Sequence, residues 1–132
     1  MKKIILDTNF LMIPWQFRVD IFSEFDRICN FNYRLHIFEE SINELRNIVS
    51  ASSGKDKKAA EFALKLIKLK NISVIKSKKK DVDSSILEDA NEDDFVATQD
   101  MQLKRELTKK GVSLIILRKK KYLILNERKL YK

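Results

Sequence analysis

The sequence predicts an α/β fold: a three-layer α/β/α sandwich around a mostly parallel five-stranded sheet, with a short extra strand allowed near the C-terminus. Short apolar runs alternate with helical stripes of apolar residues, and almost no hairpin turn separates consecutive runs. Only two glycines and one proline occur in 132 residues, which excludes many-turned β-sandwiches and collagen-like chains. A chain of this length supports one core, so we expect a single domain over residues 1–132 that includes a basic segment at 118–132.

The first half of the chain begins with an isoleucine-rich run at residues 3–6, which ends at Asp7 and is typical of a buried parallel strand. Residues 35–38 are a second short strand candidate. Apolar side chains recur at helical spacing in three segments, at 19–29, 41–50 and 59–69. The sequence Ser52-Ser53-Gly54 lies between the last two segments and predicts a stop there, because serine and glycine favour helix ends.

The second half of the chain continues the alternation of strands and helices. Short apolar runs predict strands at 72–75, 95–98 and 112–117, and the helices between them are expected at 83–90 and 100–111. Gly111 is placed to end the second of these helices in the left-handed conformation. Residues 122–125 predict the extra strand, after the basic and turn-like residues 118–121.

The net charge of +8 is strongly segregated along the chain. Residues 55–80 carry ten Lys/Arg and two Asp/Glu, residues 81–103 carry eight Asp/Glu and no Lys/Arg, and residues 104–132 carry eleven Lys/Arg and two Asp/Glu. A solvated lysine face would explain either basic block alone. The combination favours a polyanion site, because lysines bind a phosphate backbone and carboxylates beside it are costly unless a divalent cation neutralises them.

Cysteine content and hydropathy exclude two classes of protein. One cysteine cannot form an internal disulfide, and no apolar run approaches the roughly 18 residues that cross a bilayer. The N-terminal lysines are followed too soon by Asp7 for a signal peptide. We therefore expect a cytoplasmic protein that has no membrane partner.

Four acidic residues from separate segments are expected at one edge of the sheet. Asp7 and Asp100 each follow a predicted strand, Asp83 opens a predicted helix, and Glu44 lies in the first turns of another. In an open parallel sheet, ligands bind outside the carboxyl ends of the strands. The four carboxylates are therefore predicted to converge there.

Each of these acids also has a purely structural interpretation. Asp7, Asp83 and Asp100 stand where an aspartate caps the next helix, which contributes about 1 kcal/mol, and a glutamate is a common helix residue. Carboxylates gathered at one edge disfavour one another's ionisation, however, and a divalent cation removes that repulsion. The candidate ligands are all oxygens, while His36 and Cys29 offer no zinc site, so Mg²⁺ or Mn²⁺ is the expected cofactor. Such a site suits phosphodiester hydrolysis.

The residues around the four acids resemble those of the PIN-domain nucleases, and the resemblance covers the whole chain. The order and spacing of the acids match that family, and the matching motifs are Asp7-Thr8-Asn9, Asn43-Glu44-Leu45, Asp83 followed by Ile86 and Ala90, and Thr98-Gln99-Asp100. The segments 7–17 and 111–118 are similar to an archaeal branch that resembles VapC-type ribonucleases and the eukaryotic PIN nuclease of small-subunit rRNA processing.

This resemblance implies a metal-dependent endoribonuclease that cleaves single-stranded or loop RNA. It implies four catalytic metal ligands, Asp7, Glu44, Asp83 and Asp100. Asn9 and Thr98 would orient these ligands through hydrogen bonds. Relatives often have adjacent acids where this chain has Asp83-Ser84. This difference leaves open whether one or two ions bind and whether Asp81 compensates.

Basic and aromatic residues extend the expected RNA surface. The candidates for phosphate contacts are Lys78, Lys79, Lys80, Lys119, Lys120 and Lys121, in two runs that flank strand ends or turns. Solvated faces and contacts with a partner protein are the alternatives for these runs. Trp15 and Phe17 lie in an expected loop, where they either stack on unpaired bases or pack against the first helix.

Three classes of function compete on these residues. The first is the endoribonuclease, as a VapC-like toxin or an rRNA-processing nuclease, and the second is a weakly catalytic or non-catalytic RNA-binding module of ribosome assembly. A phosphoacceptor domain of receiver type fits less well, because it needs an aspartate after the third strand, where Ile75 leads into lysines. The expected partners are RNA, a second copy in a homodimer, and an antitoxin or the pre-ribosome.

Overall fold

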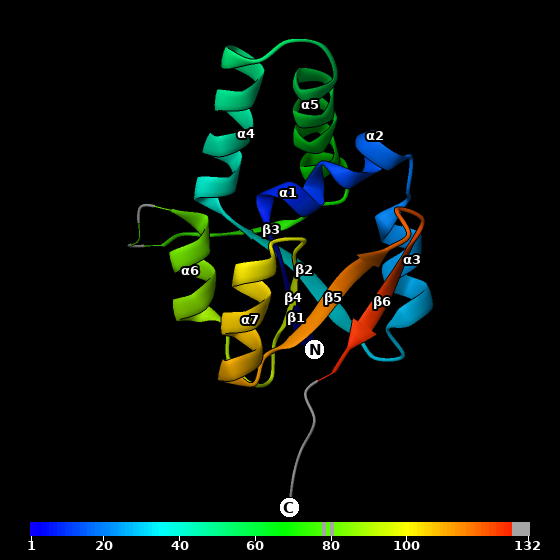
Figure 1. The fold of residues 1–132 in the computed structure, drawn as a ribbon, viewed down its shortest axis with the longest axis vertical. Helices are drawn as coiled ribbons and strands as arrows, with labels where there is room; N and C mark the ends of the chain where they lie inside the picture. The colour runs from blue at the N-terminus through cyan, green and yellow to red at the C-terminus, as the bar shows by residue number, and fades with distance from the viewer. Residues whose placement is uncertain (78, 80, 128–132) are drawn as a thin grey trace, which may run out of the picture.

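Six strands form one sheet with the order β3-β2-β1-β4-β5-β6 in the computed structural model, which describes residues 1–77, 79 and 81–127 (Figure 1). Neighbouring strands from β3 to β5 are parallel, and β6 runs antiparallel to β5. The predicted parallel sheet and its extra strand are therefore confirmed. The strands are β1 (Lys2–Leu6), β2 (Tyr33–Phe38), β3 (Ser73–Ile75), β4 (Phe95–Ala97), β5 (Ser113–Arg118) and β6 (Tyr122–Asn126).

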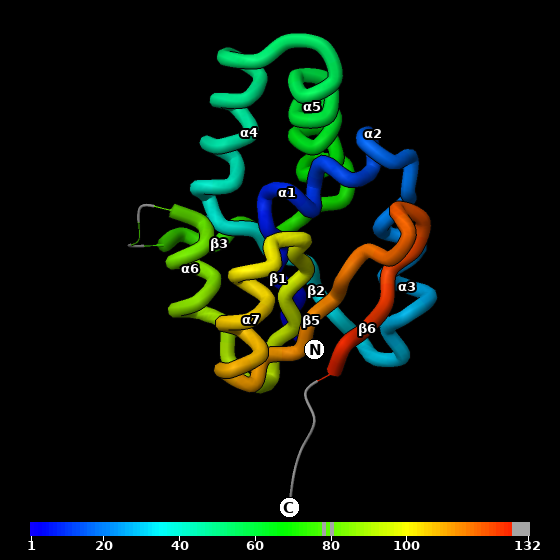
Figure 2. The backbone as a smooth tube through the Cα atoms, in the orientation of Figure 1, coloured from blue at the N-terminus to red at the C-terminus, as the bar shows by residue number. Residues whose placement is uncertain are grey.

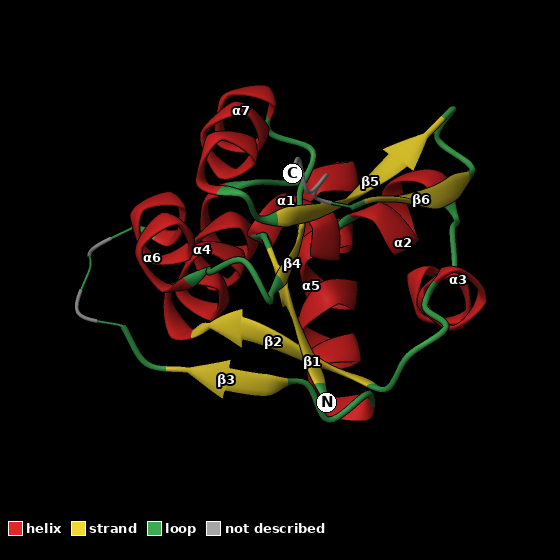
Figure 3. Cartoon of the chain, turned by 90° about the horizontal axis from the view of Figure 1, so that it is seen from below, coloured by secondary structure: helices red, strands yellow, loops and turns green. Residues whose placement is uncertain are grey.

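Helices cover both faces of this sheet, as a three-layer sandwich requires (Figure 3). Two helices, α6 and α7, pack on one face, and α1 to α5 pack on the other. The helices are α1 (Thr8–Leu11), α2 (Ile13–Phe17), α3 (Ile21–Ile28), α4 (Glu39–Ala51), α5 (Gly54–Leu69), α6 (Val82–Asp89) and α7 (Met101–Lys110).

Successive residues of the central strand β1 enter two different cores, because side chains alternate across a strand. Ile4 and Leu6 are fully buried in the core that contains Phe25 of α3. Ile5 is fully buried in the other core, which contains Ile86 of α6. A strand that is covered on both faces needs apolar residues at every position, which explains the continuous isoleucine-rich run.

The segment that follows β1 is helical, so the prediction of a loop around Trp15 and Phe17 is wrong. Asp7 caps α1, and Pro14 lies in the first turn of α2, where an N–H group has no partner within the helix. The two helices meet at Met12, whose backbone angles are themselves helical (φ −87°, ψ −13°). Pro14 was the available sequence signal, but the aromatic run around it lacks an apolar stripe.

The helices α4 and α5 form a pair that extends beyond the sheet (Figure 2). The predicted stop at Ser52 and Ser53 ends α4, but α5 begins directly afterwards at Gly54 rather than at residue 59. Gly54 has a φ of 63°, which a residue with a side chain adopts only at a cost. The glycine therefore turns the chain sharply between two adjacent helices.

The C-terminal half ends in a hairpin. Gly111 terminates α7 with a φ of 83°, in the left-handed conformation that was predicted. The turn between β5 and β6 places Lys119 and Lys120 at φ values of 52° and 55°. Such turns normally contain asparagine or glycine, and each lysine held there carries roughly 1 kcal/mol of strain or more. Lysine is thus used at this turn despite its conformational preference.

The strand order separates this fold from a receiver domain. Receiver-type sheets have the order 2-1-3-4-5. Here β1 pairs with β2 and β4, and β3 lies at the edge of the sheet. The phosphoacceptor alternative is therefore excluded by topology. Among the helices in the described part of the chain, none is long and apolar enough to cross a membrane.

Candidate active site

Asp7 lies at the carboxyl end of β1 and is only 5% exposed. Its Oδ1 accepts a hydrogen bond from the backbone N–H of Thr8 at 2.8 Å, and its Oδ2 accepts one from Oγ1 of Thr98 at 2.7 Å. Burial raises the pKa of the Asp7 carboxyl to about 6, although the hydrogen bond from Thr98 lowers it. The negative charges of Asp83 and Glu44 raise the same pKa. The fold thus fixes this carboxylate where its charge is disfavoured.

Thr98 connects Asp7 with Asp100 just beyond the end of β4. Its fully buried side chain donates to Asp7, and its Oγ1 accepts a hydrogen bond from the backbone N–H of Asp100 at 3.1 Å. Asp100 in turn caps α7, because its Oδ1 accepts from the N–H of Leu103 at 2.9 Å. Asp7 and Asp100 therefore act as helix caps and also lie at the same edge of the sheet.

Asp83 does not open α6, contrary to the prediction. The helix begins at Val82 and is capped by Asp81, whose two carboxylate oxygens accept from the backbone N–H and the Oγ of Ser84 at 2.8 and 3.1 Å. Both oxygens of Asp81 are thus engaged by the residue that stands where relatives often have an acid. Asp83 lies in the first turn, where partial desolvation raises its pKa and the charges of Asp100 and Asp81 raise it further.

Glu44 is half-buried in the second turn of α4, which begins two residues earlier than predicted. One turn before it, the fully buried Ser41 accepts a hydrogen bond through Oγ from Oγ1 of Thr8 at 2.8 Å. This contact fixes α4 beside the residue that follows Asp7. The position of Glu44 close to Asp7 is thereby set by two small side chains that the sequence analysis did not single out.

The four predicted ligands interact electrostatically at the carboxyl edge of the sheet. Asp7 is coupled to Asp83 and Glu44, and Asp83 is coupled to Asp100. The role of these four carboxylates as ligands of one metal ion stays a prediction. Among the residues described, however, no three carboxylate, histidine or cysteine side chains stand close enough together to hold a metal ion. The carboxylates share one edge without closing on a common point.

Asn9 contributes an unusual acceptor two residues after Asp7. Its Oδ1 is buried and has no hydrogen-bond partner within the described residues. Buried side-chain oxygens are nearly always paired, since an unpaired acceptor loses its hydration without compensation. The amide oxygen of Asn9 is therefore available to a donor or a cation.

The first predicted lysine run contributes one described residue. Lys78 and Lys80 lie outside the described residues. Lys79 is exposed, and its Nζ lies 3.2 Å from Oε2 of Glu88. An exposed ion pair of this kind contributes about 0–1 kcal/mol. Lys79 can therefore exchange its carboxylate partner for a phosphate at little cost.

The second lysine run forms the exposed turn between β5 and β6. Lys119 and Lys120 both have left-handed backbone angles, and the N–H of Lys121 donates to the carbonyl oxygen of Arg118 at 3.0 Å. The Nζ of Lys120 lies 5.5 Å from the centroid of the Phe17 ring. This cation–π contact places the basic turn against α2.

Two cations at the same edge were missed by the sequence analysis. Lys104 follows Asp100 by one turn on the same face of α7, and Arg118 ends β5. Burial lowers the pKa of Lys104, the charge of Arg118 lowers it further, and the charge of Asp100 raises it. Neither cation forms an ion pair within the described part of the protein. The four-residue spacing from Asp100 could have identified Lys104, but Arg118 required the strand order.

A mostly parallel sheet of this order, covered by helices on both faces, makes the chain an α/β sandwich. The match of its sequence to a family model shows which family of such domains it belongs to. The chain belongs to the family described as PIN like domain, whose sequence model matches residues 4–120. The match includes all four acidic positions, and the predicted family resemblance is confirmed.

Two known proteins show how far the similarity extends. Ribonuclease VapC4 of Methanocaldococcus jannaschii is 31% identical over 124 residues, which cover 92% of this chain and 95% of that protein. The structure of the PIN domain endonuclease Utp24 has a TM-score of 0.77 to this one, at 18% identity, and covers 98% of this chain and 96% of that chain. The first comparison gives a ribonuclease as a homologue, and the second shows the same fold.

The raised pKa of Asp7 predicts how the stability of the metal-free protein depends on pH. Because the folded-state pKa is about 6 and the ordinary value is 3.8, the folded protein retains a proton that the unfolded chain releases. The free energy of unfolding should therefore fall as the pH rises from about 4 to about 6, by up to about 3 kcal/mol from this residue. In Asp7→Asn this fall in the free energy of unfolding should be absent. The measurement is urea unfolding at a series of pH values in the presence of EDTA.

Asp93→Asn is the matched control, because this exposed carboxylate lies before β4, at the opposite edge of the sheet. It should keep the wild-type pH dependence. Parallel curves for the wild type and Asp7→Asn would show that Asp7 is not held in a charge-disfavouring site.

Proposed function

We propose that this protein is a metal-dependent endoribonuclease that hydrolyses phosphodiester bonds in single-stranded or loop RNA. The observation that carries the proposal is the set of four coupled carboxylates at the carboxyl edge of the sheet. The 31% identity to Ribonuclease VapC4 supports RNA as the substrate. A basic turn and two further cations beside this edge provide charge complementary to RNA.

The donor set fits a hard divalent cation, Mg²⁺ or Mn²⁺. Carboxylate and amide oxygens are the ligands these ions prefer. The residues proposed to hold the ion are Asp7, Glu44, Asp83 and Asp100. Two observations favour this fit: burial and, to a smaller extent, the charges of neighbouring carboxylates raise the pKa of Asp7 and Asp83, and the Oδ1 of Asn9 has no partner within the described residues. When bound there, such an ion lowers the pKa of water and offsets negative charge on the leaving oxygen.

The remaining residues of the edge position these ligands. Thr98 directs one oxygen of Asp7 and fixes the backbone N–H of Asp100, so a single hydroxyl sets the relation between two ligands. The contact between Thr8 and Ser41 sets the relation of α4, which carries Glu44, to Asp7. Both arrangements are made by hydrogen bonds within the protein itself, which reduces the rearrangement that ligand binding requires.

Substrate phosphates are proposed to bind beside Asp100. Lys104 and Arg118 lie close enough for the charge of one to lower the pKa of the other, and an anion between them would relieve that repulsion. Lys119 and Lys121 continue the basic surface along the β5–β6 turn. These residues contact the backbone rather than the bases, so they provide affinity without sequence preference.

The biological setting proposed from the relatives is a VapC-like toxin or an rRNA-processing nuclease. In the first setting, the partner is an antitoxin that blocks the acidic edge; in the second, it is the pre-ribosome. A homodimer in the cytoplasm is the proposed state of the protein.

Substitution of a proposed ligand should abolish cleavage without unfolding the protein. Asp7→Asn and Asp100→Asn should each lower the cleavage rate of a loop-containing RNA in Mn²⁺ by about a hundredfold or more, because each removes charge that holds the ion. The products should carry 3′-hydroxyl and 5′-phosphate ends, and EDTA should stop the reaction. Asp93→Asn should cleave as the wild type does.

Unchanged cleavage by Asp7→Asn and Asp100→Asn would refute the assignment of the site. The absence of cleavage together with tight RNA binding that ignores Asp7→Asn would instead indicate the non-catalytic RNA-binding module. The lack of three ligand side chains in metal-holding proximity among the described residues is the observation that favours this second candidate.

Lys104→Met should weaken RNA binding through the loss of one phosphate contact. We expect KM for RNA to rise several-fold and the slope of log affinity against log salt to become shallower by about 0.7, the value for one contact to a single strand. Lys104→Arg should restore most of the affinity because it keeps the charge. Lys109→Met, an exposed lysine in the last turn of α7, is the control, and an equal effect there would contradict a specific role for Lys104.

A further inference from the structure

Trp15 is a large aromatic side chain that the fold leaves accessible. Its side chain is 41% exposed, and its ring lies 5.8 Å from the ring of Phe62 on α5, at an interplanar angle of 55°. It is also the only tryptophan in the chain. The exposed part of the indole offers a rigid aromatic face to a planar partner.

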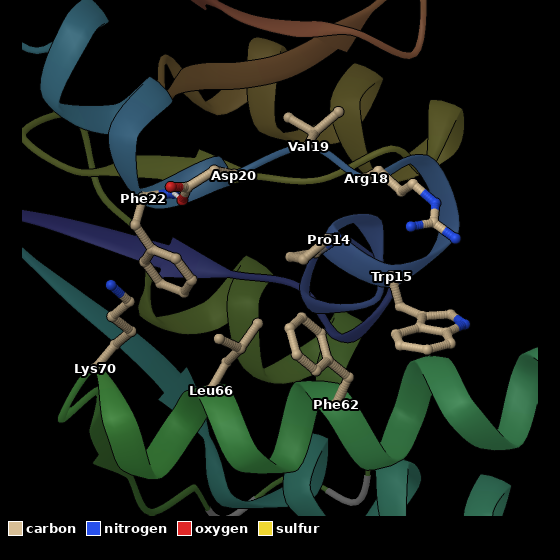
Figure 4. A pocket seen from close by; sticks show the side chains of 9 residues that line it. All are labelled: Pro14, Trp15, Arg18, Val19, Asp20, Phe22, Phe62, Leu66 and Lys70. Carbon is tan, nitrogen blue, oxygen red and sulfur yellow. Dashed lines mark hydrogen bonds between the residues drawn. The ribbon is translucent and has the colours of Figure 1, made fainter.

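A pocket of about 450 Å³ opens beside this aromatic pair (Figure 4). Pro14, Phe62 and Leu66 form its apolar wall, and the indole of Trp15 closes one end. The volume lies within the roughly 300–1,000 Å³ of small-ligand sites. The pocket is therefore large enough for a planar aromatic group that stacks on the exposed ring.

Cations surround the pocket at both ends. Figure 4 shows Arg18 at the end occupied by Trp15 and Lys70 at the other end, where its Nζ lies 5.0 Å from the centroid of the Phe22 ring. A second hollow of about 610 Å³ shares Trp15 and Arg18 and is lined by Lys55 and Lys58. None of these four cations forms an ion pair within the described residues.

The carboxylates of the two hollows do not balance these cations. The linings contain the four cations named above and two acids, Asp20 and Asp56. The Oδ1 of Asp20 already accepts the backbone N–H groups of Phe22 and Ser23 at the start of α3. The surroundings of the exposed aromatic ring therefore favour an anionic ligand.

The pocket is connected to the acidic edge by a short and nearly continuous helical path. Trp15 follows Asp7 by eight residues, through α1 and α2, and at 1.5 Å per residue this path spans about 12 Å. That length corresponds to three or four stacked nucleotides at about 3.4 Å each. Lys120, against Phe17 on the same α2, brings the basic turn to this helix.

We propose that the pocket between α2 and α5 is a nucleobase site for single-stranded RNA, in which an unpaired base stacks on Trp15 and the flanking phosphates contact Arg18, Lys55 and Lys58. This inference rests on the proposed ribonuclease function and extends it to a place where the substrate is held away from the scissile bond. Stacking tolerates every base, so the site selects single strands rather than a sequence. Duplex RNA has no free base to offer.

The emission of the single tryptophan gives a direct readout of this site. The full chain with Asp100→Asn, which prevents cleavage, is titrated with a labelled 12-nucleotide single-stranded RNA, the same RNA in a duplex, and an abasic oligomer of equal charge. Only the single strand should quench the emission saturably, with the same Kd as RNA anisotropy gives. RNA that binds by anisotropy without changing the emission would overturn the inference and leave the proposed function intact.

Substitutions at Trp15 provide the second test. Trp15→Ala should weaken binding of the single strand by about 5- to 150-fold, which corresponds to the free energy of one stacked base. In otherwise wild-type protein it should raise KM by a similar factor while kcat stays within about twofold. Trp15→Phe should restore most of the affinity for the single strand. If Trp15 only stabilised the fold, Trp15→Ala would instead weaken the binding of every RNA to the same extent. Val74→Ala, at an exposed apolar residue of the edge strand β3, should change neither value.

The remaining outcomes are also decisive. Wild-type affinity and KM in Trp15→Ala would refute the base site. Emission that depends on protein concentration without RNA would assign the pocket to a second copy of the chain and also refute it. Failure of every RNA to bind, together with absent cleavage, would instead refute the proposed function itself.

Discussion

A buried carboxylate at the end of the central strand is the constraint on which the site depends. Asp7 is anchored by the N–H of Thr8 and the hydroxyl of Thr98, yet burial and neighbouring charges oppose its ionisation. The fold keeps this unfavourable charge because the same residue caps α1 and because the Thr98 hydroxyl also fixes the backbone of Asp100. Local helix capping and the geometry of the acidic edge are therefore inseparable in this protein.

Charge is arranged around that edge in two zones. Four carboxylates lie along this edge, at the ends of β1 and β4 and in the first two turns of α4 and α6, while cations lie along α7, the β5–β6 turn and the start of α5. Lys119 and Lys120 occupy left-handed backbone positions that suit glycine better. The turn therefore carries positive charge together with backbone strain. An ion between the carboxylates and a phosphodiester beside the cations would satisfy both zones at once.

The sequence predicts most of the strands and helices, because apolar periodicity and helix-ending residues such as Gly111 are local signals. The edge location of Asp7 and Asp100 also followed, since it depends only on residues that end parallel strands. The capping role of Asp81 was assigned to Asp83 because both stand within two residues of the helix start, and only the contact with Ser84 distinguishes them. The position of Arg118 near Lys104 could not be predicted, because it depends on which strands are neighbours in the sheet.

The most direct test of the central claim is the anomalous difference map of crystals soaked in Mn²⁺. The account predicts a peak at the acidic edge, with oxygens of Asp7 and Asp100 at about 2.1 Å, and no such peak in crystals of Asp7→Asn grown in the same way. The absence of any peak at this edge in the wild-type crystals, with Mn²⁺ bound elsewhere or not at all, would contradict it.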